Sequence, residues 1–495
     1  MTLRLFNTLT GQIEPLEPAD GKALRMYACG PTVYDYGHIG NFRTFLQIDI
    51  LRRFLRLTGT AVLHVMNITD VDDKIIRNAA ETGISIGEYT QRYVEAFFED
   101  LDALRIERPQ QIARATEHIP QMVELIEKLA GAGAAYKTDD GSWYFRLKAF
   151  PEYGKLSKKD LSGMEDGARV DVDEYEKDSA RDFALWKAPR PGETSWETAI
   201  GPGRPGWHIE CSTMAMEYLG ESFDLHCGGE DLMFPHHENE IAQSETATHK
   251  TFARHWMHVR FLLVDGRKMS KSEGNFYTLR DLLLKGFKAS AIRLALVSVP
   301  YEHQMNFTFD GVIEATKAIE RLRTFRDRLT SGTFTAGRPG EMSAMQVAAQ
   351  KAGEEFIRAL ANDLNTADAR APIFELVRAA NTAIDQGQFT AADRDAILPV
   401  LKDFDAVFDV LDDRDAEPAR RALEWARKEG RMADVAPELL AAQSLGDQQI
   451  ETLVAEREQA RKRRDFARAD QIRNELAEKG VILEDSKDGV KWKRK

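Results

Sequence analysis

The 495-residue sequence contains little cysteine, no long apolar run and fewer basic than acidic side chains. Three cysteines in so long a chain argue against a disulfide framework, so Cys29, Cys211 and Cys227 are either buried thiols or metal ligands. The lack of a run of about 18 apolar residues excludes a membrane-spanning helix. The N-terminus also lacks the basic and apolar regions of a secretory signal, so we expect a cytoplasmic protein with no membrane partner.

The charge balance limits the class of partner. There are 67 Lys and Arg against 80 Asp and Glu, a formal net charge of −13. A protein that coats long nucleic acid would be basic, so this class is disfavoured, whereas binding through a local basic face stays open. The contents of 43% hydrophobic and 30% charged residues are typical of globular proteins. At about 150 residues per domain, the length predicts three to four domains.

The first recognisable unit lies near the N-terminus. Residues 24–29 form a short apolar run that ends at Gly30-Pro31, which predicts a strand and a turn. Apolar residues at helical spacing follow from Phe42 to Leu57, and residues 61–67 predict a second strand. This order predicts a βαβ unit whose loop lies at a helix N-terminus, where phosphates are commonly bound.

The rest of the chain is divided by changes in composition. Residues 119–204 change from a helical pattern to charged and then Pro- and Gly-rich sequence, which indicates an insertion into the first sheet. Helical patterns dominate from about 310 to 412, and residues 413–450 predict a linker with one helix. Residues 451–495 carry 13 Lys and Arg against 10 Asp and Glu, a locally basic segment in an acidic chain.

Histidine and cysteine concentrate in one segment. Seven of the 11 histidines and two of the three cysteines lie between positions 208 and 258. His236 and Glu240 are four residues apart where a helix is expected to begin, so they share a helical face. With Cys29 and Cys211 they would form a set of thiolate, imidazole and carboxylate ligands that suits zinc. Two alternatives stay open, namely buried cysteines beside a surface His–Glu pair, or competing ligands at Cys227, His237 and Glu238.

Two further motifs suit phosphate chemistry. Residues 37–41 (GHIGN) begin the first helix, where glycines permit close backbone approach and His38 can donate a hydrogen bond to a phosphoryl oxygen. Residues 268–272 (KMSKS) place two lysines in a glycine-containing loop that could clamp a polyphosphate. An incidental helix cap and a solvated lysine loop are the alternatives for each motif alone. The fixed order, with the His-rich segment between the two motifs, makes the combination far more specific.

Together these motifs carry a family resemblance that extends over essentially the whole chain. Residues 29–35 (CGPTVYD) leading into His38-Ile39-Gly40-Asn41, with the later KMSKS loop, resemble the paired signatures of class I aminoacyl-tRNA synthetases. Residues 206–212 (GWHIECS), residues 231–240 (DLMFPHHENE) and the segment from Asp465 to Trp492 are specifically similar to the cysteinyl-tRNA synthetase family.

The resemblance implies an α/β multidomain fold. A Rossmann-like parallel-sheet catalytic domain is expected at 1–118 and 205–252, interrupted by the connective insertion 119–204. A stem-contact region with the KMSKS loop would follow at 253–312, then a helical bundle at 313–412, a linker at 413–450 and a small anticodon-binding domain at 451–495. A monomer is expected.

The resemblance also implies an activity and its residues. L-cysteine would be activated with ATP to cysteinyl-adenylate and pyrophosphate, then transferred to the terminal ribose of tRNA(Cys) with release of AMP. One zinc ion would be held by Cys29, Cys211, His236 and Glu240, and the substrate thiolate would complete its coordination. Magnesium would accompany ATP, for which the implied binding residues are Gly37, His38, Gly40, Asn41, Gly229, Asp231 and Lys271. His38, Lys268 and Lys271 would be catalytic, whereas Thr69, Trp207 and His226 would line the amino-acid pocket.

Zinc would explain how cysteine is distinguished from serine. Shape selection between oxygen and sulfur supplies only ~1–3 kcal/mol, whereas zinc prefers and deprotonates a thiol. A separate editing domain is then unnecessary. Two positions depart from the family pattern: Asn41 stands where many class I enzymes have histidine, and Cys227 where glycine is expected. Asn41 keeps a hydrogen-bond donor without charge, and Cys227 is interpreted as a passive small residue.

The basic C-terminal segment predicts contact with tRNA. Arg461, Arg464 and Trp492 would supply phosphate contacts and base stacking. The alternative functions are a mycothiol-type ligase that joins cysteine to an amino sugar, and a non-catalytic zinc- and RNA-binding relative. The first generally lacks the C-terminal segment, and the second would not need His38, Lys268 and Lys271.

Overall fold

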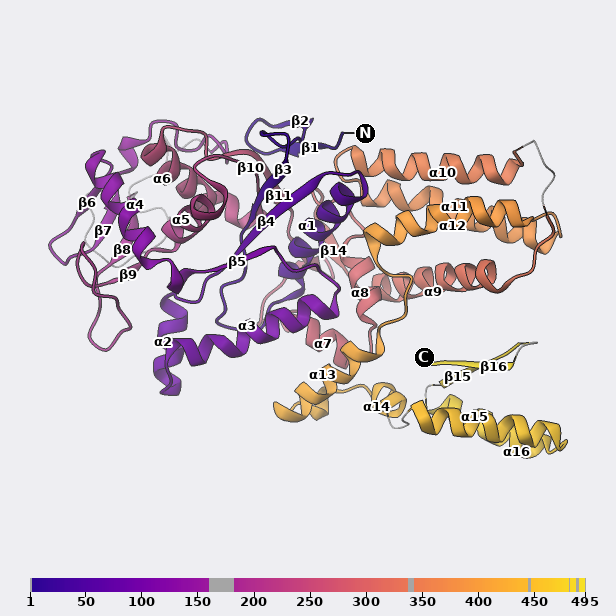
Figure 1. Ribbon diagram of the computed structural model, residues 1–495. Helices are drawn as coiled ribbons and strands as arrows, with labels where there is room; N and C mark the ends of the chain where they lie inside the picture. The colour runs from indigo at the N-terminus through magenta and orange to yellow at the C-terminus, as the bar shows by residue number, and fades with distance from the viewer. Residues whose placement is uncertain are drawn as a thin grey trace.

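The centre of the molecule is a parallel β-sheet assembled from two distant parts of the chain. The computed structural model describes residues 2–159, 182–336, 342–443, 447–479, 481–486 and 489–494. Within these residues the sheet has five strands in the order β11-β10-β3-β4-β5. They span Ala253–Val259, Phe223–Gly229, Ala23–Ala28, Ala61–Ile68 and Gln111–Arg114. Every neighbouring pair is parallel, so the two sequence halves form one sheet (Figure 1).

Side-chain alternation in β3 separates two cores, one on each face of the sheet. Met26 and Ala28 pack with helix α1 (Ile39–Leu57), whereas Tyr27 and Cys29 pack on the opposite face with α5 (Trp207–Leu219). Period-two alternation of a strand requires this division. The α5 face also holds α4 (Ile119–Gly131) and α6 (Glu238–Thr248). Cys29 is therefore directed to the same side as the His-rich segment.

The insertion forms its own antiparallel sheet at one end of the molecule. Its strands follow the order β6-β7-β8-β9 and span Ala135–Lys137, Trp143–Phe145, Phe183–Lys187 and Arg204–Pro205. Residues 160–181 of the expected insertion lie outside the described residues. Helices α2 (Asp73–Thr82) and α3 (Ile86–Ala103) connect β4 to β5, and the hairpin of β1 (Arg4–Asn7) and β2 (Gln12–Pro15) precedes the sheet.

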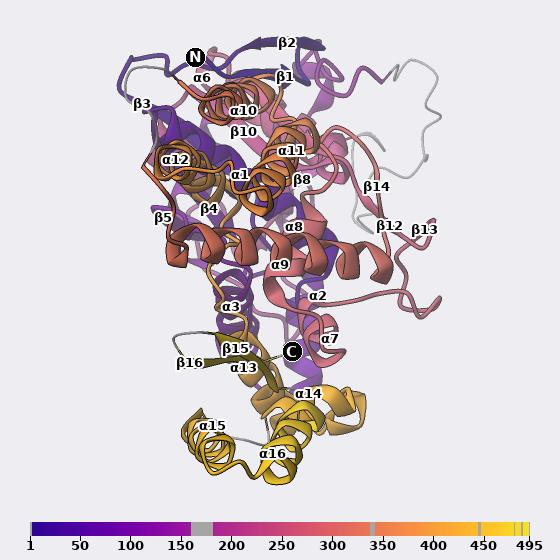
Figure 2. The same ribbon diagram turned by 90° about the vertical axis from the view of Figure 1, so that its right-hand side faces the viewer.

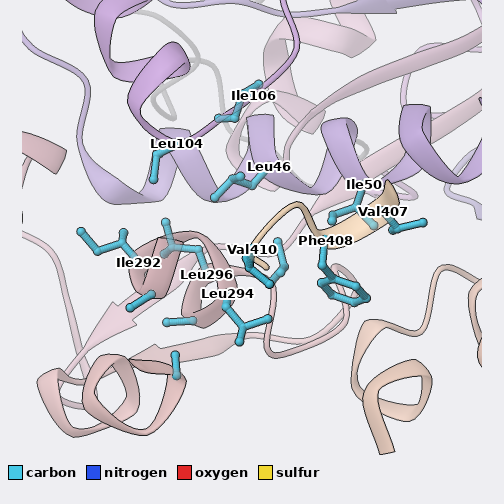
Figure 3. Packing of buried hydrophobic residues seen from close by; sticks show 14 of the residues in the cluster. Leu46, Ile50, Leu104, Ile106, Ile292, Leu294, Leu296, Val407, Phe408 and Val410 are labelled. Atoms are coloured by element: carbon cyan, nitrogen blue, oxygen red, sulfur yellow. The ribbon is translucent and has the colours of Figure 1, made fainter. Parts of the chain in front are cut away.

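The bundle lies on the side of the sheet away from the insertion (Figure 1). Its helices α9 to α12 span Phe309–Ser331, Ala344–Ala361, Thr366–Asp385 and Ala391–Phe408. Strands β12 (Leu262–Val264), β13 (Arg267–Lys268) and β14 (Met305–Phe307) and helices α7 (Leu279–Leu284) and α8 (Ala289–Leu296) connect it to the sheet. Figure 3 shows Leu46 and Ile50 of α1 near side chains of α8 and near Phe408 and Val410, within one continuous core.

A buried ion pair reinforces this junction. The Arg293 guanidinium lies 2.6 Å from the Asp49 carboxylate and also donates to the carbonyl of Phe408 at 2.6 Å. Both charged side chains are at most 1% exposed. Buried charges are tolerated only when paired and hydrogen-bonded, so these contacts fix the register of α1, α8 and the end of α12.

The C-terminal elements form a separate small core. Helices α15 (Asp447–Lys462) and α16 (Phe466–Glu478) pack with the hairpin of β15 (Val481–Ser486) and β16 (Gly489–Arg494) through Ile450, Ile472 and Leu476. Figure 2 shows them at the end of the molecule opposite to β1 and β2. Where one helix was expected within residues 413–450, the described part of this range contains α13 (Ala416–Lys428), α14 (Pro437–Gln443) and the start of α15. Helix α14 is short and is joined to α7 by a hydrogen bond from Ala436 N to Leu284 O, a contact that local sequence does not reveal.

The predicted fold class is confirmed: an α/β chain with a parallel sheet, an insertion, a helical bundle and a small C-terminal unit. The exact domain boundaries stay a prediction, and β11 begins just beyond the expected boundary at residue 252. Among the described residues, no helix combines the length and apolarity that crossing a bilayer requires.

Candidate active site

Four side chains predicted to bind zinc meet beneath the carboxyl end of β3. Cys29 follows β3, Cys211 lies in α5, His236 lies in the helical turn before α6, and Glu240 lies in α6. One ligand atom from each falls within 4.8 Å of the others. The two sulfur atoms are 4.0 Å apart, and His236 Nε2 is 3.0 Å from Glu240 Oε1. All four side chains are buried, so the donor set, its spacing and its dry surroundings fit a zinc ion.

A second group of possible ligands overlaps the first. Cys29 and Glu240 also lie within 4.8 Å of His226 and His237. Cys29 Sγ is 3.3 Å from His237 Nε2, and Glu240 Oε2 is 2.9 Å from His226 Nε2. The cluster therefore offers two ligand sets that share one thiol and one carboxylate, and only one set uses both cysteines.

The other two competing ligands have different environments. The Glu238 carboxylate accepts hydrogen bonds from the backbone N–H groups of Gly154, Leu156 and Ser157, so it holds the insertion. Cys227 packs in the core on the α1 face of the sheet and belongs to neither ligand group among the described residues. Of the competitors, only His237 lies at the cluster.

The charges within the cluster are complementary. Burial opposes ionisation of Glu240, but His226 and His236 lower its pKa to about 2. Burial likewise opposes protonation of His236, whereas Glu240 and Cys211 raise its pKa to about 10. Burial would raise the pKa of Cys211, but its contacts with Cys29 and His236 lower it to about 6. One thiolate and one carboxylate are thus favoured at neutral pH. His236, and Cys29, whose pKa is raised by burial, would release their protons when a cation binds.

Neighbouring aromatic and imidazole rings orient the ligands. His236 Nδ1 is 2.9 Å from His208 Nδ1, which leaves Nε2 directed at the cluster. The predicted pocket residue Trp207 stacks on His236 with centroids 4.2 Å apart and is 37% exposed, so it separates the cluster from solvent. His226 is fully buried and stacks on Trp256 at 4.3 Å. Partners of this kind fix the orientation of metal ligands.

The third predicted pocket residue, Thr69, belongs to a buried hydrogen-bond chain. Asn67 Oδ1 accepts from Gly30 N, Asn67 Nδ2 donates to Thr69 Oγ1, and this hydroxyl donates to Glu210. A Cβ on Gly30 would lie 1.8 Å from the carbonyl oxygen of Asn67, so only glycine fits there. The chain holds the strand ends around Cys29 together.

The first glycine-containing motif caps α1. His38 Nδ1 accepts from Asn41 N at 3.2 Å, and Asn41 Oδ1 accepts from His38 N at 3.1 Å, forming a reciprocal capping box. Asn41, which departs from the family pattern, thus has a structural role that the sequence analysis missed. Two polar residues three positions apart at the start of a helix are typical of a capping box and could have indicated this role. A Cβ on Gly40 would lie 2.9 Å from the His38 ring, and one on Gly37 3.0 Å from Phe42, so both glycines keep the motif compact.

The lysine loop is brought against this motif across more than 200 positions of sequence. Ile39 N donates to Tyr277 O at 3.0 Å, and the His38 ring lies 5.3 Å from that of Phe276. Burial lowers the pKa of His38, while nearby Asp231 opposes the shift. Asp231 Oδ1 lies only 2.5 Å from where a Cβ on Gly229 would stand, so glycine lets this carboxylate fold over the strand end.

The two predicted catalytic lysines occupy different positions in the loop. Lys268 is exposed on β13, while Lys271 Nζ lies 2.6 Å from Asp35 Oδ2. A cavity of about 430 Å³ opens beside this ion pair and is also lined by Phe276, Asp281 and Asp434. Asp35 was not singled out by sequence analysis, because its partner is 236 residues away.

The predicted tRNA-binding residues all lie in the C-terminal unit. Arg461 is exposed near the end of α15, and Arg464 is exposed in the turn before α16 with a positive φ of 64°. Trp492 is partly buried against the small core, so part of its ring surface is used for packing.

Comparison with known proteins agrees with this arrangement. Residues 15–317 match the family model of the class I (C) tRNA synthetase catalytic domain, residues 355–411 match a DALR domain, and residues 446–492 match the cysteinyl-tRNA ligase anticodon binding domain. The chain is 57% identical to the cysteine–tRNA ligase of Koribacter versatilis and 54% identical to that of Solibacter usitatus, with 100% of each chain covered. The corresponding ligase of Leptospira interrogans is 43% identical and covers 100% of this chain.

Solved structures share the fold at low identity. Mycobacterium tuberculosis methionyl-tRNA synthetase, in complex with methionyl-adenylate, has a TM-score of 0.56 at 16% identity, covering 86% of this chain and 95% of the other. The leucyl enzyme of Agrobacterium radiobacter, in a ternary complex, has a TM-score of 0.58 at 12% identity, covering 80% and 85%. These two similarities concern the fold alone.

Proposed function

Because the chain belongs to the cysteinyl-tRNA synthetase family, we propose that it activates L-cysteine with ATP and transfers it to the 3′-terminal ribose of tRNA(Cys). The first step forms cysteinyl-adenylate and pyrophosphate, and the second releases AMP. The observation that carries this proposal is the buried Cys29, Cys211, His236 and Glu240 cluster on the same sheet edge as the capped N-terminus of α1. A thiol-selective site thus lies beside a phosphate-binding one.

Cysteine selection is assigned to the four cluster residues, with Thr69, Trp207 and His226 around them. Zinc held by the two thiolates, the imidazole and the carboxylate would accept the substrate sulfur as a further ligand and leave a serine hydroxyl unbound. The low pKa of Glu240 and the lowered pKa of Cys211 keep these two donors deprotonated, whereas His236 and Cys29 would lose their protons to the incoming metal. Trp207 covers His236 and limits water access to the site.

Adenylate formation is assigned to the two signature motifs and the β10 edge. Activation depends on positioning and on neutralising charge at the phosphates. His38, held by its cap, contacts the α-phosphate, and Gly37, Gly40 and Asn41 supply the close backbone approach. Asp231, beside Gly229, binds the ribose, and Lys268 and Lys271 stabilise the departing pyrophosphate. Magnesium accompanies ATP.

The C-terminal unit is assigned to tRNA(Cys). Residues 451–495 are locally basic, and the match to an anticodon binding domain over 446–492 supports this role. Arg461, Arg464 and the accessible part of Trp492 are the proposed contacts. The working form is proposed to be a cytoplasmic monomer.

The direct test is transfer of radiolabelled cysteine to bulk tRNA with ATP and magnesium, alongside cysteine-dependent ATP–pyrophosphate exchange. We expect both reactions, and serine should support neither. Pyrophosphate exchange without tRNA charging would indicate that the acceptor is a different molecule, such as an amino sugar. Absence of both reactions would contradict the proposal.

A further inference from the structure

The ion pair between Lys271 and Asp35 joins the two signature motifs. Lys271 Nζ lies 2.6 Å from Asp35 Oδ2, and the two side chains are 67% and 35% exposed. The other carboxylate oxygen, Oδ1, accepts a hydrogen bond from Tyr36 N at 2.8 Å. One oxygen is therefore held by the backbone while the other faces the lysine, so the carboxylate has a defined orientation.

The backbone that carries Asp35 is fixed from several sides. The Tyr36 ring contacts Tyr93 and Trp425 at centroid distances of 5.3 and 5.4 Å, and the Arg280 guanidinium lies 5.3 Å from the same ring. Tyr36 Oη also accepts a hydrogen bond from Trp425 Nε1 at 2.9 Å. The carboxylate thus belongs to a rigid segment three residues before His38.

Lys271, in contrast, is held at the tip of a turn. Ser270 N donates to Asn275 Oδ1 and Asn275 Nδ2 donates to Lys268 O, which closes the base of the loop. Gly274 forms the turn with a φ of 67°. The Lys271 side chain extends from this turn and is 67% exposed, and its ammonium group contacts Asp35 and lies 5.3 Å from the centroid of the Phe276 ring. The hydrogen bond to Asp35 raises the pKa of Lys271, so the lysine stays charged while it is held.

We propose that Asp35 is a positioning residue. It holds the ammonium group of Lys271 in the ATP-free enzyme and releases it to the triphosphate when ATP binds. This inference rests on the proposed function of the lysine loop. A solvent-exposed ion pair is weak, whereas a triphosphate presents several negative charges at the neighbouring helix N-terminus. The carboxylate therefore keeps the ammonium group close without preventing its transfer, and it takes the group back when pyrophosphate leaves.

The test compares Asp35→Asn with the wild type in cysteine-dependent ATP–pyrophosphate exchange at low salt. Asparagine keeps an oxygen for Tyr36 N but removes the charge that competes for Lys271. We expect the KM for ATP to fall by about 2- to 5-fold, the range an exposed ion pair supplies, with kcat changed by less than about twofold. The separate variant Asp35→Glu keeps a carboxylate at this position, so its KM for ATP should stay near the wild-type value.

Two controls distinguish the transfer of Lys271 from Asp35 to ATP from a general electrostatic effect of removing a negative charge. Asp434→Asn removes a carboxylate from the same cavity, but its partner is Arg431 at 2.7 Å, so the KM for ATP should not change. In a Lys271→Ala background, Asp35→Asn should no longer lower this KM. An equal decrease in that background, or an increased KM for Asp35→Asn in the native background, would overturn the inference.

The outcome also remains separable from the proposed function. Loss of exchange in the wild type would contradict the ligase assignment itself. The competition would then be measured by calorimetric titration of ATP into the wild type, Asp35→Asn, Lys271→Ala and the double variant, where Asp35→Asn should increase the affinity for ATP only when Lys271 is present. Equal binding by the wild type and Asp35→Asn would refute the role of Asp35.

Discussion

At the scale of single residues, each nitrogen of His236 has a separate partner. His236 Nδ1 faces His208, and Nε2 faces Glu240 in the cluster. His237, the next residue, contacts Cys29 but uses Nδ1 to reach His258 at 2.8 Å. The ligand set with two thiols is softer than the one with two imidazoles and therefore suits zinc bound to a thiolate substrate.

Replacement of one thiol tests this ligand set. Cys211→Ser should lower the zinc content and raise the KM for cysteine by at least about tenfold, because even indirect disturbance of a zinc site costs about 10- to 100-fold in affinity or activity. Metal analysis and pyrophosphate exchange with cysteine and serine measure these effects. Cys227→Ala is the matched control, because the Cys227 thiol lies on the other face of the sheet. This variant should keep the full zinc content. Unchanged metal content in Cys211→Ser would exclude Cys211 as a ligand.

The sequence named all four of these ligands, although only two of them by a local pattern. The four-residue spacing of His236 and Glu240 placed both on one side of a turn, and the structure brings Cys29 and Cys211 to them. The sequence left open whether His237 is a ligand, because the directions of two consecutive side chains depend on the geometry of the turn that carries them. Asp35 was missed because ion pairing between distant loops leaves no local pattern.

At the scale of elements, α13 connects the linker to the first signature motif. Trp425 is buried at 9% exposure and contacts Tyr36 by its ring and its indole N–H. Arg280 and Arg431 lie over the Trp425 ring at 5.4 and 5.2 Å. This arrangement explains why the linker region folds as helix: its amphipathic face has a partner in the catalytic domain, which composition alone does not show.

Two substitutions distinguish packing from hydrogen bonding at this contact. Trp425→Ala should destabilise α13 docking by about 3–5 kcal/mol, as for other buried aromatic residues. Trp425→Phe should cost only about 1 kcal/mol, because it loses the indole donor but keeps a ring. Thermal unfolding and amide exchange across α13 measure the difference. Equal destabilisation by both changes would assign the contact to the hydrogen bond instead.

At the scale of the whole molecule, the cores divide the chain unequally. Catalytic sheet, bundle and α13 share one hydrophobic core on the α1 face, whereas α15, α16 and the last hairpin have a core of their own. The helical pattern from 310 to 412 predicted the bundle well. The size of the shared core was not predictable, because it depends on α1 and α8 meeting through Arg293 and Asp49.

This division predicts the effect of removing the C-terminal unit. Truncation after residue 445, a position outside the described residues, should abolish tRNA charging and leave cysteine-dependent pyrophosphate exchange within about twofold of the full chain. The large core stays intact, so the Tm of the main transition should be preserved. Loss of both activities would point instead to a structural role for residues 451–495.

The strand order of the central sheet has a consequence for synthesis of the chain on the ribosome. Strand β10 lies between β3 and β11, so one edge of β3 has no partner until the second half of the sheet is made. At about 5–20 residues per second, synthesis of the intervening chain takes on the order of 10 to 40 s. An unpaired strand edge can recruit other chains during that interval. The nascent protein therefore depends on protection of this edge, and slow translation should increase its aggregation.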